Sequence, residues 1–345
     1  MIRPPFLDLS LADKVAIFNK ISNDTGMPSF AVEKDWWVVQ TLSIIFEMEA
    51  GKHLVFKGGT SLSKAWKLIQ RFSEDVDLSI DRAYLGFGGE LSKSQRTKLR
   101  KAASEFTTGP FFEELRGRFA EKGINELTFK VVEAEDTDQD PRIIIVNYPN
   151  VMKSPGYIEP RVQIEIGCRS MQEPSTLMPI SSMVDEIYST APFTQRAVQI
   201  QTVNPERTFL EKVFLLHEEF HRPPEKMRVE RLSRHLYDIV KLAEAGYADK
   251  ALADPDLYRT IVDHRYIFTR VGGVNYNLLQ PNTIDPLPIP AVVEAWKVDY
   301  QKMVEQMIYE ASPPSFKEVI RDLETLKNRI NQLPWRLNKE YPLTD

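Results

Sequence analysis

The segment spanning residues 55–80, VFKGGTSLSKAWKLIQRFSEDVDLSI, constrains the fold more than any other part of the chain. A short apolar strand end leads into Gly58-Gly59, a tight turn that can open a helix. After a spacer of helical length, Asp75 and Asp77 alternate with apolar Val76 and Leu78, which is typical of a half-buried strand. The segment therefore predicts the order strand, glycine turn, helix, strand.

Asp75 and Asp77 are the candidates for chemistry in this unit. Residues i and i+2 of a strand point to the same face, so the two carboxylates are expected to lie side by side. Like charges at that separation repel unless a cation lies between them. Magnesium prefers carboxylate, water and phosphate oxygens, and two such ions about 4 Å apart assist phosphoryl displacement. The pattern predicts nucleoside-triphosphate chemistry.

Each motif also has an ordinary interpretation. A lone Asp-x-Asp is common on solvated strands, and a lone Gly-Gly is usually only a turn. Their ordered combination, with Arg71 and Ser73 between them, favours function. Thr60 and Ser73 offer hydroxyls to a phosphate. Arg71 is expected to pair either with Asp77 or with the γ-phosphate, and the sequence does not choose between the two.

The composition is that of an ordinary globular protein. The 345 residues are 42% hydrophobic and 27% charged, and no apolar run reaches the length of a membrane-spanning helix. The first residues lack the apolar core of a signal peptide, and the single cysteine, Cys168, excludes an internal disulfide and a cysteine-rich metal site. These features predict a cytoplasmic protein.

The charge pattern leaves RNA contact open. A net charge of −5 argues against broad, nonspecific binding of nucleic acid. Basic residues nevertheless gather in a predicted helix at 91–106 and again between Arg222 and Lys241. Most such runs are solvated faces, but the stretch from Arg228 to Arg234 could hold an RNA backbone.

The order of predicted elements indicates an α+β fold. Domains are expected at 1–203, which contains the sheet, and at 204–345, which is helical. Strands are expected at 53–57, 75–80, 127–134, 142–148, 161–167 and 197–203. Helices are expected at 10–24, 30–48, 60–70, 91–106, 110–122, 205–221, 226–245, 255–270, 290–310 and 315–332.

A competing motif lies at residues 217–221. His217-Glu218-Glu219-Phe220-His221 matches H-E-x-x-H, which on a helix places two histidines on one face, as zinc proteases require. The helix is ended at once by Arg222-Pro223-Pro224, and no third ligand follows. A zinc metalloprotease that uses His217 and His221 is therefore the weaker alternative.

The central segment resembles the AbiEii/AbiGii toxin family, a branch of the DNA polymerase β-like nucleotidyltransferase superfamily. The family pattern is a Gly-Gly-Thr-x-Leu turn followed by Arg-x-Ser-x-Asp-x-Asp-Leu. The matching residues are Gly58, Gly59, Thr60, Leu62, Arg71, Ser73, Asp75, Asp77 and Leu78. Weaker matches between about residues 30 and 245 are Glu33-Lys34-Asp35-Trp36, Glu165, Glu211-Lys212 and Arg234-His235-Leu236-Tyr237-Asp238.

The resemblance implies a polymerase β-like mixed sheet flanked by helices, followed by a C-terminal helical bundle. It implies a toxin that transfers NMP from an NTP to an acceptor hydroxyl, plausibly at the 3′ end of tRNA. The toxin would belong to a toxin–antitoxin or abortive-infection system and have a cognate antitoxin. The alternative is a nucleotide-binding or RNA-binding module that has lost catalysis.

The resemblance also assigns roles to residues. Asp75, Asp77 and Glu165 would hold two Mg²⁺ ions, or Mn²⁺, with Glu165 as general base or metal ligand. In the alternating strand 162–166 Glu165 shares a face with Gln163. The alternative for Glu165 is an ordinary solvent-exposed position on an outer strand. Gly58, Gly59, Thr60, Arg71 and Ser73 would contact the nucleotide.

Two further site residues come from the predicted helical half. Lys212 would reach the triphosphate, but it could also be a plain surface lysine. Asp238 matches a family acid, and a structural ion pair is its alternative. The family arginine beside that acid is displaced here to Arg234.

Overall fold

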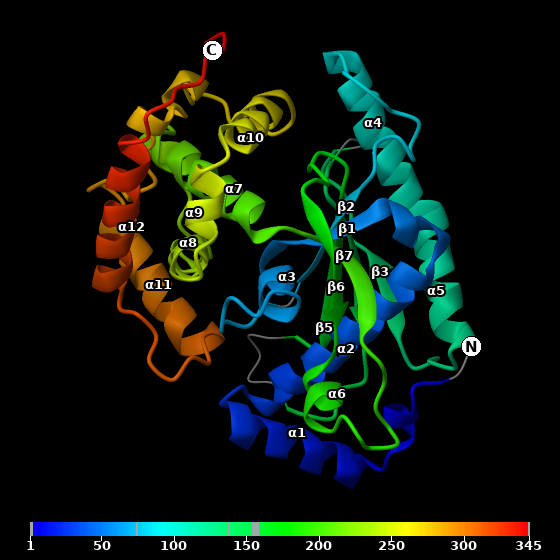
Figure 1. Cartoon of the computed structure of the whole chain (residues 1–345). Helices are drawn as coiled ribbons and strands as arrows, with labels where there is room; N and C mark the ends of the chain where they lie inside the picture. The colour runs from blue at the N-terminus through cyan, green and yellow to red at the C-terminus, as the bar shows by residue number, and fades with distance from the viewer. Residues whose placement is uncertain (1–2, 74, 137–138, 154–158, 344–345) are drawn as a thin grey trace. The chain divides into compact units, whose positions relative to one another are not determined.

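The computed structural model describes residues 3–73, 75–136, 139–153 and 159–343. The chain forms two compact units (Figure 1). The first unit comprises Met1–Ala65 and Phe72–Val203, and the second comprises Trp66–Arg71 and Asn204–Asp345. The predicted division into domains 1–203 and 204–345 stays a prediction, because compactness alone does not show that either part folds independently.

The first unit is built on one mixed sheet with strand order β3-β4-β5-β2-β1-β7-β6. β2 pairs in parallel with β5, and β1 pairs in parallel with β7, whereas the other neighbours are antiparallel. The strands are β1 Leu54–Lys57, β2 Asp75–Ile80, β3 Thr128–Val131, β4 Arg142–Asn147, β5 Arg161–Gly167, β6 Ser175–Ile180 and β7 Val198–Val203.

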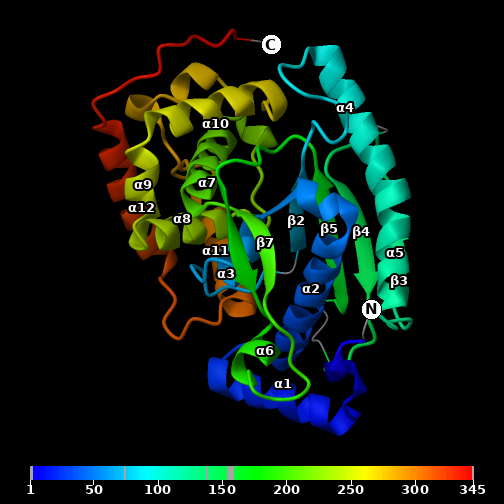
Figure 2. The same ribbon diagram turned by 45° about the vertical axis from the view of Figure 1, so that its right-hand side comes forward.

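Helices cover this sheet because the central strands bury apolar side chains. α2 runs across the sheet and contacts β5 (Figures 1 and 2). α4, a π-helical turn at Thr107–Phe111 and α5 follow one another as one long rod. The helices of the unit are α1 Leu11–Thr25, α2 Ser29–Glu47, α3 Gly58–Lys64, α4 Lys93–Phe106, α5 Phe112–Glu121 and α6 Met183–Ile187.

The second unit is helical. α7 is buried on nearly all sides, and α8 packs against both α7 and α12. Its helices are α7 Pro205–Phe220, α8 Arg234–Glu244, α9 Tyr247–Leu252, α10 Pro255–Phe268, α11 Val293–Met307 and α12 Phe316–Asn331, with short 3₁₀ turns at Pro224–Lys226, Tyr276–Leu278 and Pro281–Thr283. The α+β prediction is confirmed.

Several predicted boundaries are wrong. The helix expected at 60–70 ends at Lys64, and residues 66–71 belong to the second unit. The helix expected at 226–245 begins only at Arg234. The short helices α6 and α9 and strand β6 were not predicted. β6 lies at the edge of the sheet, is largely exposed and contains Pro179, so it lacks the apolar alternation of a central strand.

Within the described ranges, no helix is both long enough and apolar enough to span a membrane.

Candidate active site

Three acidic side chains, Asp75, Asp77 and Glu165, lie together on one face of the sheet. β2 and β5 are paired so that Asp77 lies beside Glu165 and Asp75 lies beside Gln163. The acids are half-buried, while the residues that alternate with them are buried in the core. Since directly paired residues of adjacent strands share a face, all three carboxylates point to the same side. We call these three residues the carboxylate face.

Gly58 brings the glycine turn against this face. Its φ of +79° is in the left-handed region that favours glycine, and a Cβ placed on it would lie 1.9 Å from Oδ2 of Asp77. The pairing of Lys57 with Asp77 across β1 and β2 explains this approach. The Asp77 carboxylate therefore lies against the backbone at the start of α3, where any side chain at position 58 would collide with it.

Buried polar contacts hold the glycine turn and strand β2 in place. The hydroxyl of Thr60 donates to the carbonyl oxygen of Asp75 at 2.6 Å, and the hydroxyl of Ser61 donates to that of Gly58 at 2.9 Å. Lys64, near the end of α3, forms a buried ion pair of 2.6 Å with Asp35 of α2. The hydroxyl of Thr60 thus has an internal partner, and its predicted contact with a phosphate stays a prediction.

Gln163 was not singled out as a functional residue. Its Nε2 donates to Oε1 of Glu165 at 2.8 Å. The hydrogen bond helps to orient the Glu165 carboxylate on the face that it shares with Asp77. The alternation of strand 162–166 shows that the two residues share a face, but only the structure shows that they are bonded.

The donors of the carboxylate face fit magnesium better than a closed metal cage. Among the residues that the structure describes, no three acidic, histidine or cysteine side chains form a preassembled set of metal ligands. Magnesium is usually held by one or two carboxylates together with waters and substrate phosphates, so it does not need such a set. The hard oxygens of Asp75, Asp77 and Glu165 match this chemistry.

The upstream motif residues have structural partners in this unit. Both carboxylate oxygens of Glu33 accept backbone N–H groups, from Val151 at 2.7 Å and from Met152 at 2.9 Å. Burial raises the pKa of Glu33. Asp35 accepts the N–H of Met183 at 2.7 Å in addition to its pair with Lys64. These acids connect α2 to the loops and to α3.

A second polar cluster lies within the helical unit. Arg71 forms a two-pronged ion pair with Asp238, at 2.7 Å from Nε to Oδ1 and 2.8 Å from Nη2 to Oδ2. Lys212 lies 2.9 Å from Oδ2 of the same acid and 3.1 Å from Nδ1 of His235. Arg71, Lys212 and Asp238 are buried. We call Arg71, Lys212, His235 and Asp238 the ion-pair cluster.

The pKa values in the ion-pair cluster follow from burial and mutual attraction. Burial raises the pKa of the Asp238 carboxyl, but Arg71 and Lys212 outweigh it and hold that pKa well below its usual range. Burial lowers the pKa of Lys212, with Asp238 opposing. Burial and the neighbouring Lys212 hold the pKa of His235 well below 6.5. The Nδ1 atom of a neutral His235 can accept a hydrogen bond from the Lys212 ammonium.

This cluster changes three predictions. Arg71 pairs with Asp238, a partner that the sequence did not indicate. The surface-lysine alternative for Lys212 is wrong, because α7 is buried around it. Asp238 forms the ion pair that was its structural alternative, and its assignment to the catalytic site stays a prediction. His235 was not predicted as a site residue, and its only sequence signal is its position within the Arg234–Asp238 segment.

Ser73 precedes Asp75 in a stretch without helix or strand and is partly buried. The next residue, Glu74, lies outside the described residues. The expected contact of Ser73 with the nucleotide stays a prediction.

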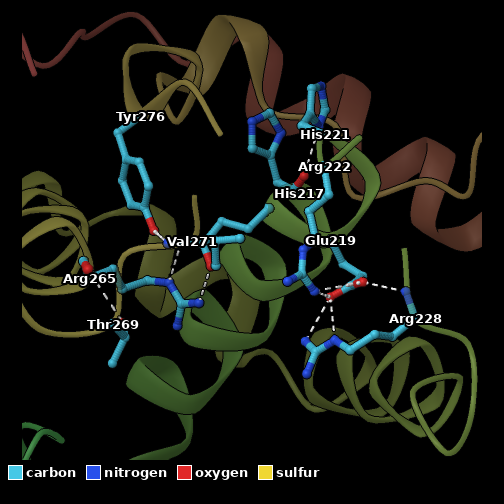
Figure 3. Close-up of polar contacts among 10 residues, drawn as sticks. His217, Glu219, His221, Arg222, Arg228, Arg265, Thr269, Val271 and Tyr276 are labelled. Atoms are coloured by element: carbon cyan, nitrogen blue, oxygen red, sulfur yellow. Dashed lines mark hydrogen bonds and ion pairs between the residues drawn. The ribbon is translucent and has the colours of Figure 1, made fainter. Parts of the chain in front are cut away.

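The H-E-x-x-H motif does not form a protease site. Figure 3 shows His217 and His221 side by side, and their rings stack at 3.8 Å between centroids. Nδ1 of His221 donates to the carbonyl of His217 at 2.7 Å. Nδ1 of His217 accepts the N–H of Asp285 at 2.9 Å, and burial lowers the pKa of His217 to about 3.

The two glutamates of this motif form ion pairs with arginines. Glu218, the base that a metalloprotease would need, is buried in an ion pair with Arg265. Glu219 pairs with both Arg222 and Arg228 (Figure 3). The arrangement is that of a structural core, which removes the basis for a zinc metalloprotease.

Ion pairs within the helical unit reduce the positive charge that the stretch between Arg222 and Lys241 could offer to RNA. Arg222 and Arg228 share Glu219, and Lys241 contacts Glu244 and Glu310. In the first unit, Lys93, Lys98 and Lys101 on α4 are exposed. Lys226, Arg228 and Arg231 are exposed as well, so both basic stretches present cations to solvent.

Comparison with known proteins identifies one matching family. The family model described as a nucleotidyl transferase AbiEii toxin of a type IV toxin–antitoxin system matches residues 42–322. No curated protein matches the sequence significantly.

Two solved structures are similar over most of their length. MenT4, the nucleotidyltransferase toxin Rv2826c from Mycobacterium tuberculosis H37Rv, is 17% identical with a TM-score of 0.43, and the match covers 93% of this chain and 99% of that one. JHP933 from Helicobacter pylori is 14% identical with a TM-score of 0.43, and the match covers 87% and 92% of the two chains. At these TM-scores the structures add nothing to the family match.

Proposed function

The chain belongs to the AbiEii family of nucleotidyltransferase toxins, and on this premise we propose that it transfers NMP from an NTP to a hydroxyl of an RNA acceptor. The supporting observation is the register of β2 and β5, which aligns Asp77 with Glu165 and keeps Asp75 on the same face. Three half-buried carboxylates next to a glycine turn are suited to a divalent cation and a triphosphate.

The proposed reaction is a single displacement at the α-phosphorus. The acceptor oxygen forms a bond to phosphorus, the bond to the bridging oxygen of the β-phosphate breaks, and pyrophosphate leaves. The proton of the acceptor hydroxyl passes to Glu165 or to water. Glu165 is oriented for this role by Gln163. Bound Mg²⁺ or Mn²⁺, held by Asp75, Asp77 and Glu165, would neutralise charge on the phosphates.

The backbone at Gly58 and Gly59 is the proposed contact for the triphosphate. Gly58 lets the Asp77 carboxylate lie against the start of α3, so a triphosphate held through a cation on Asp77 would lie next to this turn. Thr60 supports the site by holding the carbonyl of Asp75, and the family resemblance further assigns Ser73 and Lys212 to the nucleotide. Catalysis would depend on positioning and on charge neutralisation rather than on a covalent intermediate.

RNA is the proposed acceptor, and the 3′ end of tRNA is the proposed site on it. This step rests on the family resemblance. The exposed Lys93, Lys98 and Lys101 on α4 support it, because clustered cations bind phosphate backbones. Membership of a toxin family in toxin–antitoxin systems also implies a cognate antitoxin. NTP and tRNA are found together in the cytoplasm, which is therefore the proposed location.

A phosphate on Ser73 is expected to inactivate the site, because a dianion two residues before Asp75 would repel the carboxylates and the incoming triphosphate. A Ser73→Glu variant should lose most transfer activity while Ser73→Ala keeps it. Full activity of Ser73→Glu would exclude this form of regulation.

The decisive experiment incubates the protein with Mg²⁺, bulk RNA and each α-labelled NTP separately, and then sequences the RNA 3′ ends. The proposal expects label and added nucleotides on RNA with at least one NTP, and none with Glu165→Gln. Glu90→Gln, at an exposed acid of the same unit, serves as the matched control. Binding without transfer would support the inactive-module alternative, and shortened RNA would support a nuclease.

A further inference from the structure

Residues 333–343, which we call the tail segment, follow α12 and contain no helix or strand. In Figure 2 this segment is drawn in red, running from the end of α12 toward α10. Two of its residues are nonetheless as buried as core residues, Leu337 at 7% exposure and Tyr341 at 3%. An irregular segment with buried side chains needs partners for its backbone as well.

Two side-chain amides supply these partners. Nε2 of Gln280 donates to the carbonyl of Leu337 at 2.9 Å, and the N–H of Leu337 donates back to Oε1 of Gln280 at 2.7 Å. Asn277 makes the same pair of bonds with Tyr341, at 2.9 Å and 2.8 Å. Each amide therefore binds both the N–H and the C=O of one tail residue. These hydrogen bonds do not depend on which side chain that residue carries.

Selectivity comes from the surroundings of Tyr341. Its ring packs against Tyr266 and Tyr276, and its hydroxyl donates to Oδ1 of Asp263 at 2.6 Å. The same carboxylate pairs with Lys339 of the tail at 2.7 Å. The hydroxyl of Tyr266 donates to the carbonyl of Pro342 at 3.2 Å. These contacts come from α10 and from the turn at Tyr276–Leu278.

The tail does not fill the space around it. A cavity of about 1020 Å³ lies beside it, lined by Asn277, Gln280 and the residues from Leu337 to Leu343. The segment is attached through two pairs of backbone hydrogen bonds and through the buried side chains of Leu337 and Tyr341. Recognition of an extended backbone, with pockets for spaced side chains, is one of the recurring modes of peptide binding.

We propose that Asn277, Gln280, Asp263, Tyr266 and Tyr276 form a peptide-binding groove, and that its ligand is an extended segment with a large aliphatic residue followed four positions later by tyrosine. The tail segment occupies the groove within its own chain. The same segment from a second copy of this chain is the occupant that the groove accepts when its own tail is displaced. This binding site is separate from the nucleotidyl-transfer chemistry.

The test uses the full chain and a fluorescein-labelled peptide of residues 333–343. Leu337→Asp/Tyr341→Ala releases the tail and should bind the peptide at least tenfold more tightly than the wild type, whose groove is filled. Adding Asn277→Ala/Gln280→Ala should abolish that gain, whereas adding Gln301→Ala, at an exposed glutamine of α11, should not. A peptide carrying the same two tail substitutions should not bind.

Equal binding by the wild type and the tail-released variant would overturn the proposal, as would binding that survives loss of both amides. A second measurement covers the case in which the tail-released variant does not fold. In the otherwise unchanged chain, Gln280→Ala should raise amide hydrogen exchange at Leu337 at least tenfold. Unchanged exchange there would also overturn the proposal.

Discussion

The carboxylate face of the first unit and the ion-pair cluster of the second hold charged side chains in contrasting surroundings. Asp75, Asp77 and Glu165 carry charge of one sign and are half-buried on the sheet. In the ion-pair cluster, a fully buried carboxylate, Asp238, is matched by the cations Arg71 and Lys212.

Under the proposed function, the difference separates a reactive arrangement from a structural one. Like charges held together by the fold attract a cation and a polyanionic substrate that it carries. Opposite charges that already satisfy one another stabilise the fold as long as all partners remain. Substitutions in the two regions should therefore have opposite effects on activity and on stability.

The largest expected effect is on stability, from Asp238→Ala. Removing this acid leaves Arg71 and Lys212 buried without a counter-charge, which should cost about 3–5 kcal/mol in the free energy of unfolding. Urea unfolding measures the loss. Asp249→Ala, which removes an exposed acid paired with Arg329, should change stability little. Equal stability of the two variants would contradict the structural role of Asp238.

Asp77→Asn should give the reverse pattern. Loss of a charged oxygen donor should reduce nucleotidyl transfer by more than about 100-fold, equivalent to about 2.7 kcal/mol in the activation free energy. The melting temperature should be unchanged or slightly higher, because a repulsion between like charges is removed. Transfer of labelled NMP and thermal unfolding, measured on the same preparation, provide the check. An active Asp77→Asn would exclude the carboxylate face as the catalytic site.

Gly58→Ala tests whether the glycine turn must approach Asp77. The new methyl group would overlap Oδ2 of Asp77, and the residue would be strained at φ +79°. We expect a loss of about 1–2 kcal/mol in stability and a clear fall in transfer activity.

Gly86→Ala is the matched control for this prediction. Gly86 has a φ of +86°, but a Cβ on it would meet nothing within 4 Å. The Gly86→Ala variant has the backbone strain without the collision, so the protein should lose some stability and keep its transfer activity. If both variants kept full activity, close approach of the turn to Asp77 would not matter for transfer.

The smallest expected effect is a pH dependence from His235. Its pKa in the folded protein is held well below 6.5, whereas the unfolded chain titrates near 6.5. The stability that depends on neutral His235 is therefore present above about pH 6.5 and is lost as the pH falls, by no more than about 1.4 kcal/mol per pH unit.

Urea unfolding of the wild type and of His235→Gln between pH 7.5 and pH 5.5 measures this contribution. The variant should show a shallower loss of stability on acidification. Parallel curves for the two proteins would show that His235 is not the group that titrates.

Prediction from sequence succeeded where local pattern and chemistry agree. The alternation in 75–80 and 161–167 matches β2 and β5 at both ends. It failed where tertiary contacts override the local pattern. Residues 66–71 read as a continuation of a helix, but they join the second unit, where Gln70 accepts the N–H of Tyr309 and Arg71 pairs with Asp238.

By itself the sequence determined that Asp75 and Asp77 share a face, that a glycine turn precedes them and that the chain belongs to a nucleotidyltransferase toxin family. These properties follow from local periodicity and from the residues of one short motif. Only the tertiary structure decided that Glu165 lies beside Asp77, that Gly58 has no room for a side chain and that Lys212 is buried beside Asp238. The pairing of β2 with β5 and the burial of Lys212 depend on contacts between segments far apart in the chain, which one short motif does not contain.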